Sequence, residues 1–467
     1  MTKLMQMIVL HALRLGDSWE WLAYTMAALV EVTLLLAVVM VSVAVFIWME
    51  RKVSARIQDR LGPTRTGGRF GWLQSPADGL KLLCKEDLIP AGADQMLFRL
   101  APYISFCASF SVFLAIPFAS GWVAERLDVA VFFVLAVSGL EVFGVILGGY
   151  ASGSKWSLYG AMREAAQVVS YEIPLGMCVV VPVLLSGSMD LVTIGDAQAG
   201  WVNQWYLLHD PFTFVTFWIY VTCATAGVNR APFDLPEAES ELVAGFMTEY
   251  SGFRWSIFMM AEYTAMFSVS ALGAILFLGG WNGPVPVAQL LGLTAEHGIA
   301  AVALANLLGF ANFLLKVYVG VTFMMWLRWT LPRLRIDQVM TTCLKYCVPL
   351  ASVCLLGAML WTYTFSLYGG VQGMLHPAPT ATGREEARRV GQASRALGGT
   401  SHIQQPDVSS AAPAHPWTGL RRPTSSTSRC AVAESKPEAQ ARMPRSTNLA
   451  CASGFHWGGP FFEPRSS

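Results

Sequence analysis

The chain has 467 residues, of which 54% are hydrophobic and 13% are charged. A soluble domain carries about 25% charged residues, so this composition excludes an ordinary soluble enzyme. The formal net charge is only +1, which argues against a nucleic-acid-binding protein. Apolar runs of about twenty residues recur, and such runs are long enough to cross a bilayer. We therefore expect an all-α polytopic membrane protein, because a helix satisfies its own backbone polar groups inside the membrane.

About eight membrane-spanning helices are expected within residues 1–370. The apolar runs place them at about 22–48, 99–120, 129–151, 163–186, 211–228, 253–279, 300–327 and 347–369. Four loops, taken with the residues at the span ends as 51–99, 152–163, 229–254 and 328–346, carry seventeen Lys and Arg residues, whereas the loops on the other side of the membrane carry one. The positive-inside rule then puts the basic loops in the cytoplasm and the N-terminus outside.

Two segments outside the spans have a character of their own. The first long loop contains "SPADGLKLLCKEDLIP" (75–90), where leucines recur near one helical face between charged residues. It is too short to span a bilayer, so we expect an interfacial amphipathic helix, with a packed loop helix as the alternative. Residues 371–467 carry ten prolines and no apolar period, which predicts a disordered Pro/Ser/Arg-rich tail.

The sequence offers no ligand set for a metal or a nucleotide. Nine cysteines are scattered without a C-x-x-C pair. We find neither a Walker loop nor a strand-linked dinucleotide fingerprint. We therefore expect no metal site, no cofactor bound by this chain and no catalytic residue that acts by itself.

Several ionisable residues fall inside the predicted spans. They are Glu31, Glu141, Glu172, Glu262 and Lys316. Such a residue costs roughly 2.5–3.5 kcal/mol on insertion scales, so it is a functional candidate by default. Glutamates in apolar surroundings can exchange protons near neutral pH, which suits a proton relay. The alternative is that some of them, Glu31 and Glu141 above all, lie near span ends or serve packing.

A carboxylate-rich segment, "NRAPFDLPEAESELVAGFMTEYSG" (229–252), follows the fifth predicted span. Its carboxylates are Asp234, Glu237, Glu239, Glu241 and Glu249, against the one cation Arg230. Asp234, a proline in the first turn and Glu237 fit a capped helix start. Capping accounts for only two of the five carboxylates. The others favour a surface that collects protons or senses charge.

At these residues the chain resembles a known family, the H subunits of bacterial NADH–quinone oxidoreductase (respiratory complex I), which are the counterpart of mitochondrial complex I subunit 1. The blocks that carry the resemblance are "ERKVSARIQDRLGP" (50–63) with "QSPADGLKLLCKE" (74–86), "AMREAAQVVSYE" (161–172), the segment 229–252 with "MAEYTAMF" (260–267), and "LRWTLPRLRIDQVM" (327–340). They cover residues 20–370 in family order. The tail has no counterpart in the family.

The resemblance implies a multi-pass component of a proton-translocating NADH–quinone oxidoreductase in the cell inner membrane, active only within the complex. Its first and sixth spans and the interfacial helix frame a chamber for the quinone substrate. Iron–sulfur clusters and FMN are implied in partner subunits, and the partners are the hydrophilic quinone-site subunits, small membrane-arm subunits and the lipid bilayer. Ubiquinone and menaquinone stay open as alternatives.

The resemblance also implies roles for individual residues. Those matching the quinone chamber are Glu50, Arg51, Arg60, Asp78 and Arg230. Those matching the proton path are Tyr171, Glu172, Glu237, Glu239, Glu241, Glu262 and Lys316. Those matching the loop that docks on the hydrophilic arm are Arg333, Arg335 and Asp337.

Two positions depart from the family pattern. Relatives usually read "AETNR" where this chain reads "AGVNR", so Gly227 replaces a glutamate of the path. Met247 stands where bacterial relatives often have histidine. The missing glutamate weakens the inference of proton coupling, and Glu141 is a candidate to compensate for it.

Two other functions remain as alternatives. The membrane component of a proton-pumping hydrogenase or formate hydrogenlyase shares the fold, although the first-loop blocks favour the quinone enzyme. A stand-alone ion transporter would be expected to show an internal repeat with paired broken helices, and none is found.

Overall fold

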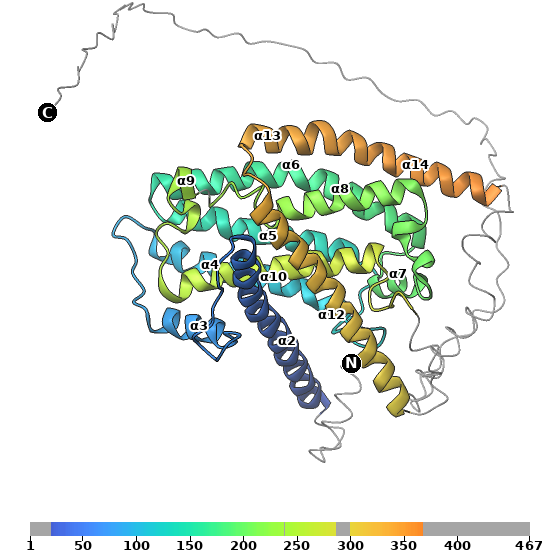
Figure 1. The fold of residues 1–467 in the computed structure, drawn as a ribbon, viewed down its shortest axis with the longest axis horizontal. Coiled ribbons are helices and arrows are strands. Elements are labelled where there is room, and N and C mark those ends of the chain that lie inside the picture. Colours follow the sequence, from blue (N-terminus) through green and yellow to red (C-terminus); the bar gives the residue numbers. More distant parts are fainter. Residues whose placement is uncertain (1–19, 238, 286–298, 368–467) are drawn as a thin grey trace, which may run out of the picture. The chain divides into compact units, whose positions relative to one another are not determined.

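The computed structural model describes residues 20–237, 239–285 and 299–367. The chain divides near Gly398, and all of the described residues lie before that division. The predicted tail, 371–467, lies outside the described residues. The described part is built of helices and turns, with one isolated bridge between Ala119 and Trp122 (Figure 1).

Seven of the described helices are long and apolar enough to cross a membrane, which confirms the prediction of an all-α polytopic membrane protein. These spans are formed by α2 (Glu20–Ile57), α4 (Gln95–Ser111), α5 (Ala130–Ala151), α6 (Lys155–Ser186), α10 (Gly252–Phe277), α12 (Ile299–Thr330) and α14 (Val348–Leu367). The fifth predicted span corresponds to α8 (Pro211–Gly227), which has 17 residues. That length lies at the short end of what spans a bilayer.

Shorter elements connect these helices. They are α3 (Gln74–Cys84), α7 (Leu191–Ala197), α9 (Glu239–Leu242), α13 (Ile336–Met340) and the 3₁₀ turns Val112–Leu114, Val202–Gln204, Tyr206–Leu208 and Gly245–Met247. A π-helical segment, Thr341–Cys347, joins α13 to α14 without a break.

Two expected loops are largely helical. Helix α6 begins at Lys155, and α12 continues to Thr330, so the expected loops at 152–163 and 328–346 are shorter than the hydropathy pattern indicates. Hydropathy marks where apolar residues stop, whereas a helix continues as long as its backbone hydrogen bonds do. As a result Arg163 and Arg328 lie on helices and not in loops.

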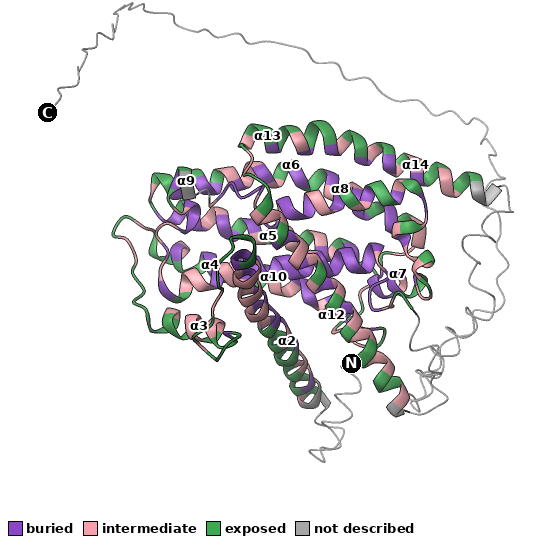
Figure 2. Cartoon of the chain, in the orientation of Figure 1, coloured by how far each residue is buried: buried purple, intermediate pink, exposed green. Residues whose placement is uncertain are grey.

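Helix α10 forms the centre of the described bundle, and 83% of its most apolar 18-residue stretch is buried (Figure 2). It packs against α2, α4, α8 and α12. Small residues such as Ala261, Ala265 and Ala271 allow this close approach, as is usual between membrane helices. Consequently a polar residue on α10 faces protein rather than the surroundings of the bundle.

The helix predicted within 75–90 is present as α3, which has no fully buried residue. It contacts α2 and α10, and the hydroxyl of Ser75 donates a hydrogen bond of 2.8 Å to the carbonyl of Ala44 on α2. Leu80 and Leu83 remain exposed in the chain alone.

The expected helix start at Asp234 is wrong. Residues 232–236 form a buried turn, and α9 begins only at Glu239 and has four residues. Asp234 does not cap a helix, because its carboxylate accepts a hydrogen bond of 2.8 Å from Arg333. Burial of Phe233 and Leu235 in the core determines the backbone here and outweighs the local capping preference.

Candidate functional site

A cavity of about 580 Å³ opens between α2, α3, α10 and α12; we call it the chamber cavity. Four of the five residues predicted for the quinone chamber line it: Glu50, Arg51, Arg60 and Asp78. Much of the remaining wall is apolar and includes Val43, Ile47 and Met259. The chamber cavity therefore combines an apolar wall with a cluster of charged side chains.

One ion pair connects α2 and α3 at this cavity. The guanidinium of Arg51 lies 2.5 Å from the carboxylate of Asp78. The amide of Gln74 adds a hydrogen bond of 3.2 Å to the same carboxylate. This pair fixes α3 against α2 at the chamber cavity.

A second cavity, of about 340 Å³, lies between α4, α5, α6, α8 and α10; we call it the glutamate cavity. Its ionisable lining residues are Glu141, Glu164, Tyr171, Glu172 and Glu262. The structure thus brings together three predicted path residues, Tyr171, Glu172 and Glu262, from two helices. Serines of α4, Ser105 and Ser109, also line this cavity.

The buried side chain of Arg230 lies between the two cavities. Its guanidinium is 3.6 Å from Glu50, which lines the chamber cavity, and 3.5 Å from Glu262, which lines the glutamate cavity. The exposed fraction of each residue is small: 7% for Glu50, 3% for Arg230 and 8% for Glu262. A row of three buried charged side chains therefore joins one cavity to the other.

Two residues that the sequence did not single out complete this row. The hydroxyl of Tyr263 donates a hydrogen bond of 2.5 Å to Glu50, and Arg328 forms an ion pair with the same carboxylate. The ring of Tyr263 also lies 4.6 Å from the guanidinium of Arg230, a cation–π distance. Tyr263 directly follows Glu262 on α10, and this adjacency was the available sequence signal.

Glu237 extends the row toward the carboxylate-rich segment. Its carboxyl group lies within interaction distance of that of Glu262, and a proton held by one of the two would relieve the repulsion between two carboxylates. Burial, and then the negative charge of Asp234, raise the pKa of Glu237, while Arg230 opposes the shift. Burial would lower the pKa of Arg230, but Glu50 and the other neighbouring carboxylates raise it above its usual value. Arg230 therefore stays a cation, and Glu237 is able to hold a proton.

Glu164 is a further buried carboxylate that sequence reasoning missed. It accepts a hydrogen bond of 2.8 Å from Asn229, whose amide oxygen accepts one of 3.0 Å from Gln167. Hydropathy put Glu164 at the edge of a span, where a charge needs no explanation. A better signal is that Glu164, Gln167 and Tyr171 share one face of α6 at spacings of three and four residues.

The two departures from the family pattern lie in different surroundings. Gly227 lines the glutamate cavity, in whose wall Glu141 also lies. A Cβ atom at Gly227 would lie 3.2 Å from the ring of Tyr171. Met247 belongs to a buried cluster with Phe98 and Phe258.

Other predicted residues lie away from both cavities. Glu241 is exposed and pairs with Arg163 at 2.6 Å, and the side chain of Glu239 is outside the described residues. Arg335 and Asp337 are exposed at the start of α13. Lys316 contacts backbone carbonyls at the end of α10.

Among the residues that the structure describes, no group of three or more His, Cys, Asp or Glu side chains is arranged to hold a metal ion. The side chains that line the two cavities can exchange protons and stabilise charge, because they combine carboxylates with guanidinium and phenol groups.

The chain matches known proteins over most of its described length. A family model described as NADH dehydrogenase matches residues 30–359. Relatives named as H subunits of NADH-quinone oxidoreductase include one from Anaeromyxobacter dehalogenans, 46% identical over 68% of this chain and 77% of its own length. Another, from Geobacillus kaustophilus, is 48% identical over 68% of this chain and 89% of its own length. The chain therefore belongs to the NADH dehydrogenase family, as a membrane component of the NADH–quinone oxidoreductase H type.

Proposed function

We propose that this chain frames the quinone chamber of a proton-translocating NADH–quinone oxidoreductase and couples quinone reduction to proton translocation. One observation carries the proposal: buried Arg230 lies within 3.6 Å of carboxylates that line two different cavities, Glu50 and Glu262. A charge change in one cavity is therefore felt in the other through a single side chain.

The chamber cavity suits a quinone because such a molecule has an isoprenoid tail and a polar headgroup. The apolar wall accommodates the tail, and the charges of Arg51, Asp78 and Arg60 lie where a polar group would be held. Electrons come from iron–sulfur clusters and FMN in partner subunits. Arg333, Arg335 and Asp337 form the docking surface for the hydrophilic partners, on the cytoplasmic side where the basic loops lie.

The coupling follows from charge balance. Reducing a quinone to a quinol takes two electrons and two protons, and electrons that arrive before protons leave negative charge in the chamber cavity. Because the row is buried, Coulomb interactions are weakly screened there. Negative charge draws the Arg230 cation toward the chamber, which weakens its hold on Glu262. Glu262 then takes up a proton from its neighbour Glu237.

The proton path consists of Glu237, Glu262, Tyr171, Glu172 and, from the geometry, Glu141 and Glu164. Glu239 and Glu241 supply the acidic surface at its cytoplasmic start. We place Lys316 outside the path, because it lines neither of the two cavities that the path connects.

The test compares a buried and an exposed glutamate. Glu262→Gln should lower both NADH–quinone activity and dye-reported proton pumping in membrane vesicles at least about tenfold, because a neutral amide cannot relay a proton. Glu86→Gln is the matched control and should change both within about twofold, because Glu86 is exposed and lines neither cavity. Near-normal activity and near-normal pumping in an assembled Glu262→Gln complex would contradict the proposal.

A further inference from the structure

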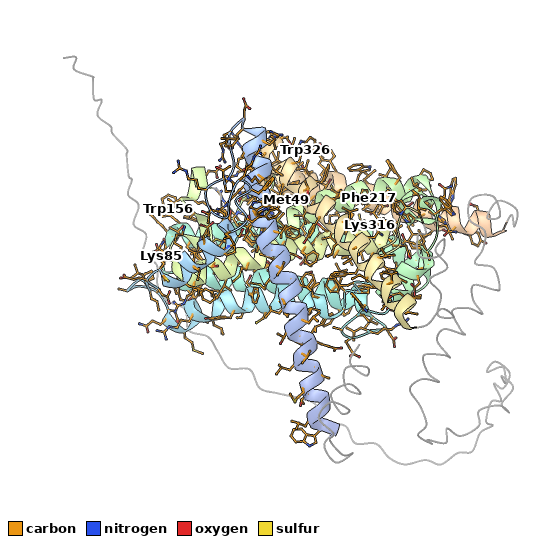
Figure 3. The ribbon with its side chains drawn as sticks, turned by 60° about the horizontal axis from the view of Figure 1, so that its bottom comes forward. Met49, Lys85, Trp156, Phe217, Lys316 and Trp326 are labelled. Atoms are coloured by element: carbon orange, nitrogen blue, oxygen red, sulfur yellow. The ribbon has the colours of Figure 1, made fainter. Side chains whose placement is uncertain are left out.

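Lys316 stands apart from the two cavities, on α12 close to Phe217 of α8 (Figure 3). Its ammonium group donates hydrogen bonds to the carbonyls of Leu278 (2.6 Å) and Gly280 (2.9 Å), and to the carbonyl of Asn282. A protonated lysine has three N–H donors and no acceptor, so three carbonyls match the charged form.

These carbonyls converge because of how α10 ends. The helix stops at Phe277, and Gly279 and Gly280 have φ angles of +74° and +54°, a region that glycine adopts without steric cost. The amide of Gly280 donates to the carbonyl of Ala274 at 2.8 Å, which closes a left-handed helix-ending turn. The carbonyls beyond the turn then point at one place, and the Lys316 ammonium fills it.

The same turn has other partners, and those described are neutral. Asn312, one helical turn before Lys316 on α12, donates a hydrogen bond of 2.9 Å to the carbonyl of Trp281. The amide of Gln198 donates one of 2.9 Å to the carbonyl of Ile275. The ring of Trp205 lies 4.5 Å from the Lys316 ammonium.

We propose that Lys316 is a positioning residue: its ammonium caps the carbonyl end of α10 and so holds in place the helix that carries Glu262 and Tyr263. The C-terminus of a helix carries about half an elementary negative charge, and a cation there is favourable. The turn 279–281 is buried, and carbonyls that are buried away from water need a protein donor. A proton relay must release its proton at every turnover, whereas a cap must retain it.

The first arm of the test measures stability in the assembled complex. Lys316→Met keeps the length of the side chain but removes the charge and the three donors. We expect the half-life of NADH–quinone activity on heating to fall about tenfold, because three buried carbonyls lose their donor. Asn312→Ala, the matched control, removes one neutral hydrogen bond from the same turn and should shorten the half-life only about two- to threefold.

The second arm is chemical rescue. Lys316→Ala leaves the three carbonyls without a hydrogen-bond donor, next to an apolar cavity of about 210 Å³ that Lys316 also lines. Propylamine crosses membranes as the neutral amine and binds as propylammonium, so it should restore at least half of the lost heat stability, or of the lost assembly if Lys316→Ala does not assemble. Tetramethylammonium has the charge but no N–H donor, and should not restore it.

The third arm separates a cap from a relay and rests on the proposed function. The Lys316→Met complex that assembles should pump as many protons per electron as the unchanged complex. Normal heat stability with a lowered proton-to-electron ratio would overturn the cap, as would failure of propylamine to rescue. Quinone reduction without pumping in the unchanged complex would instead refute the proposed function and leave the cap standing.

Discussion

The hydroxyl of Tyr263 donates a hydrogen bond of 2.5 Å to the carboxylate of Glu50, and this contact joins α10 to α2. The same tyrosine ring lies against the guanidinium of Arg230. Tyr263 therefore contacts both members of the ion pair at the chamber cavity, and it lines that cavity itself. Tyr263 and Arg328 together fix the position of the Glu50 carboxylate relative to Arg230.

Tyr263→Phe should lower kcat/KM for quinone about tenfold, because a hydrogen bond to a buried charged group contributes roughly 1.5–3 kcal/mol. The ring and its contact with Arg230 remain, so the complex should assemble in normal amounts. The measurement is NADH–quinone activity normalised to assembled complex. An unchanged kcat/KM would show that the hydroxyl does not position Glu50.

Breaking the pair between Arg51 and Asp78 should slow quinone reduction but spare electron transfer from NADH to an artificial hydrophilic acceptor. Asp78→Asn and Arg51→Ala should each lower kcat/KM for quinone about tenfold, and the double variant little more, because both remove one interaction. Lys85→Ala is the control, because Lys85 is exposed just after α3 and does not line the chamber cavity. Equal losses with both acceptors in a fully assembled complex would place the pair outside the quinone site.

The carboxyl group of Glu237 should make the heat stability of the complex depend on pH. Burial and Asp234 raise its pKa in the folded protein. A carboxyl group of this kind adds stability below its ordinary pKa of about 4.3, and the contribution is lost as the pH rises through the raised value. Glu237→Gln does not titrate, so its complex should inactivate more slowly on heating than the unchanged complex at about pH 8. That advantage should shrink toward about pH 5. A ratio of half-lives that is constant with pH would contradict this account.

Glu141 and Gly227 both line the glutamate cavity, so a glutamate at position 227 should compensate for the loss of Glu141. Glu141→Gln should lower proton pumping about tenfold if Glu141 replaces the glutamate missing at position 227. Adding Gly227→Glu should restore much of the loss, since the ring of Tyr171 needs to move only a few tenths of an ångström. Gly227→Gln has the same shape without the acid and should not restore it. Rescue by the glutamine would show that volume, not proton exchange, matters.

The tail carries a separate prediction from sequence. Deleting residues 375–467 should leave assembly and quinone reductase activity unchanged, because the segment has no apolar period with which to build a core. Native gel electrophoresis of membranes, followed by an activity stain, measures both. Loss of the assembled complex in the truncated strain would assign the tail a structural role.

The sequence alone determined the spanning helices of this protein and several residues of its candidate site. Apolar length predicted the spanning helices, and leucine spacing predicted α3, because both depend on neighbours along the chain. The family blocks also pointed to Glu50, Arg51, Arg60 and Asp78, which the structure gathers at one cavity.

Tertiary structure alone decided which charges meet. Glu50, Arg230 and Glu262 come from segments about two hundred residues apart at the extremes, and no local period reports such a contact. Packing also overrode the capping signal at Asp234, whose carboxylate pairs with Arg333. It placed Lys316 on the carbonyl end of α10 rather than among the glutamates. The physical reason is the same in each case: a buried charge is stabilised by the groups that surround it in space, and the fold of the whole bundle determines those groups.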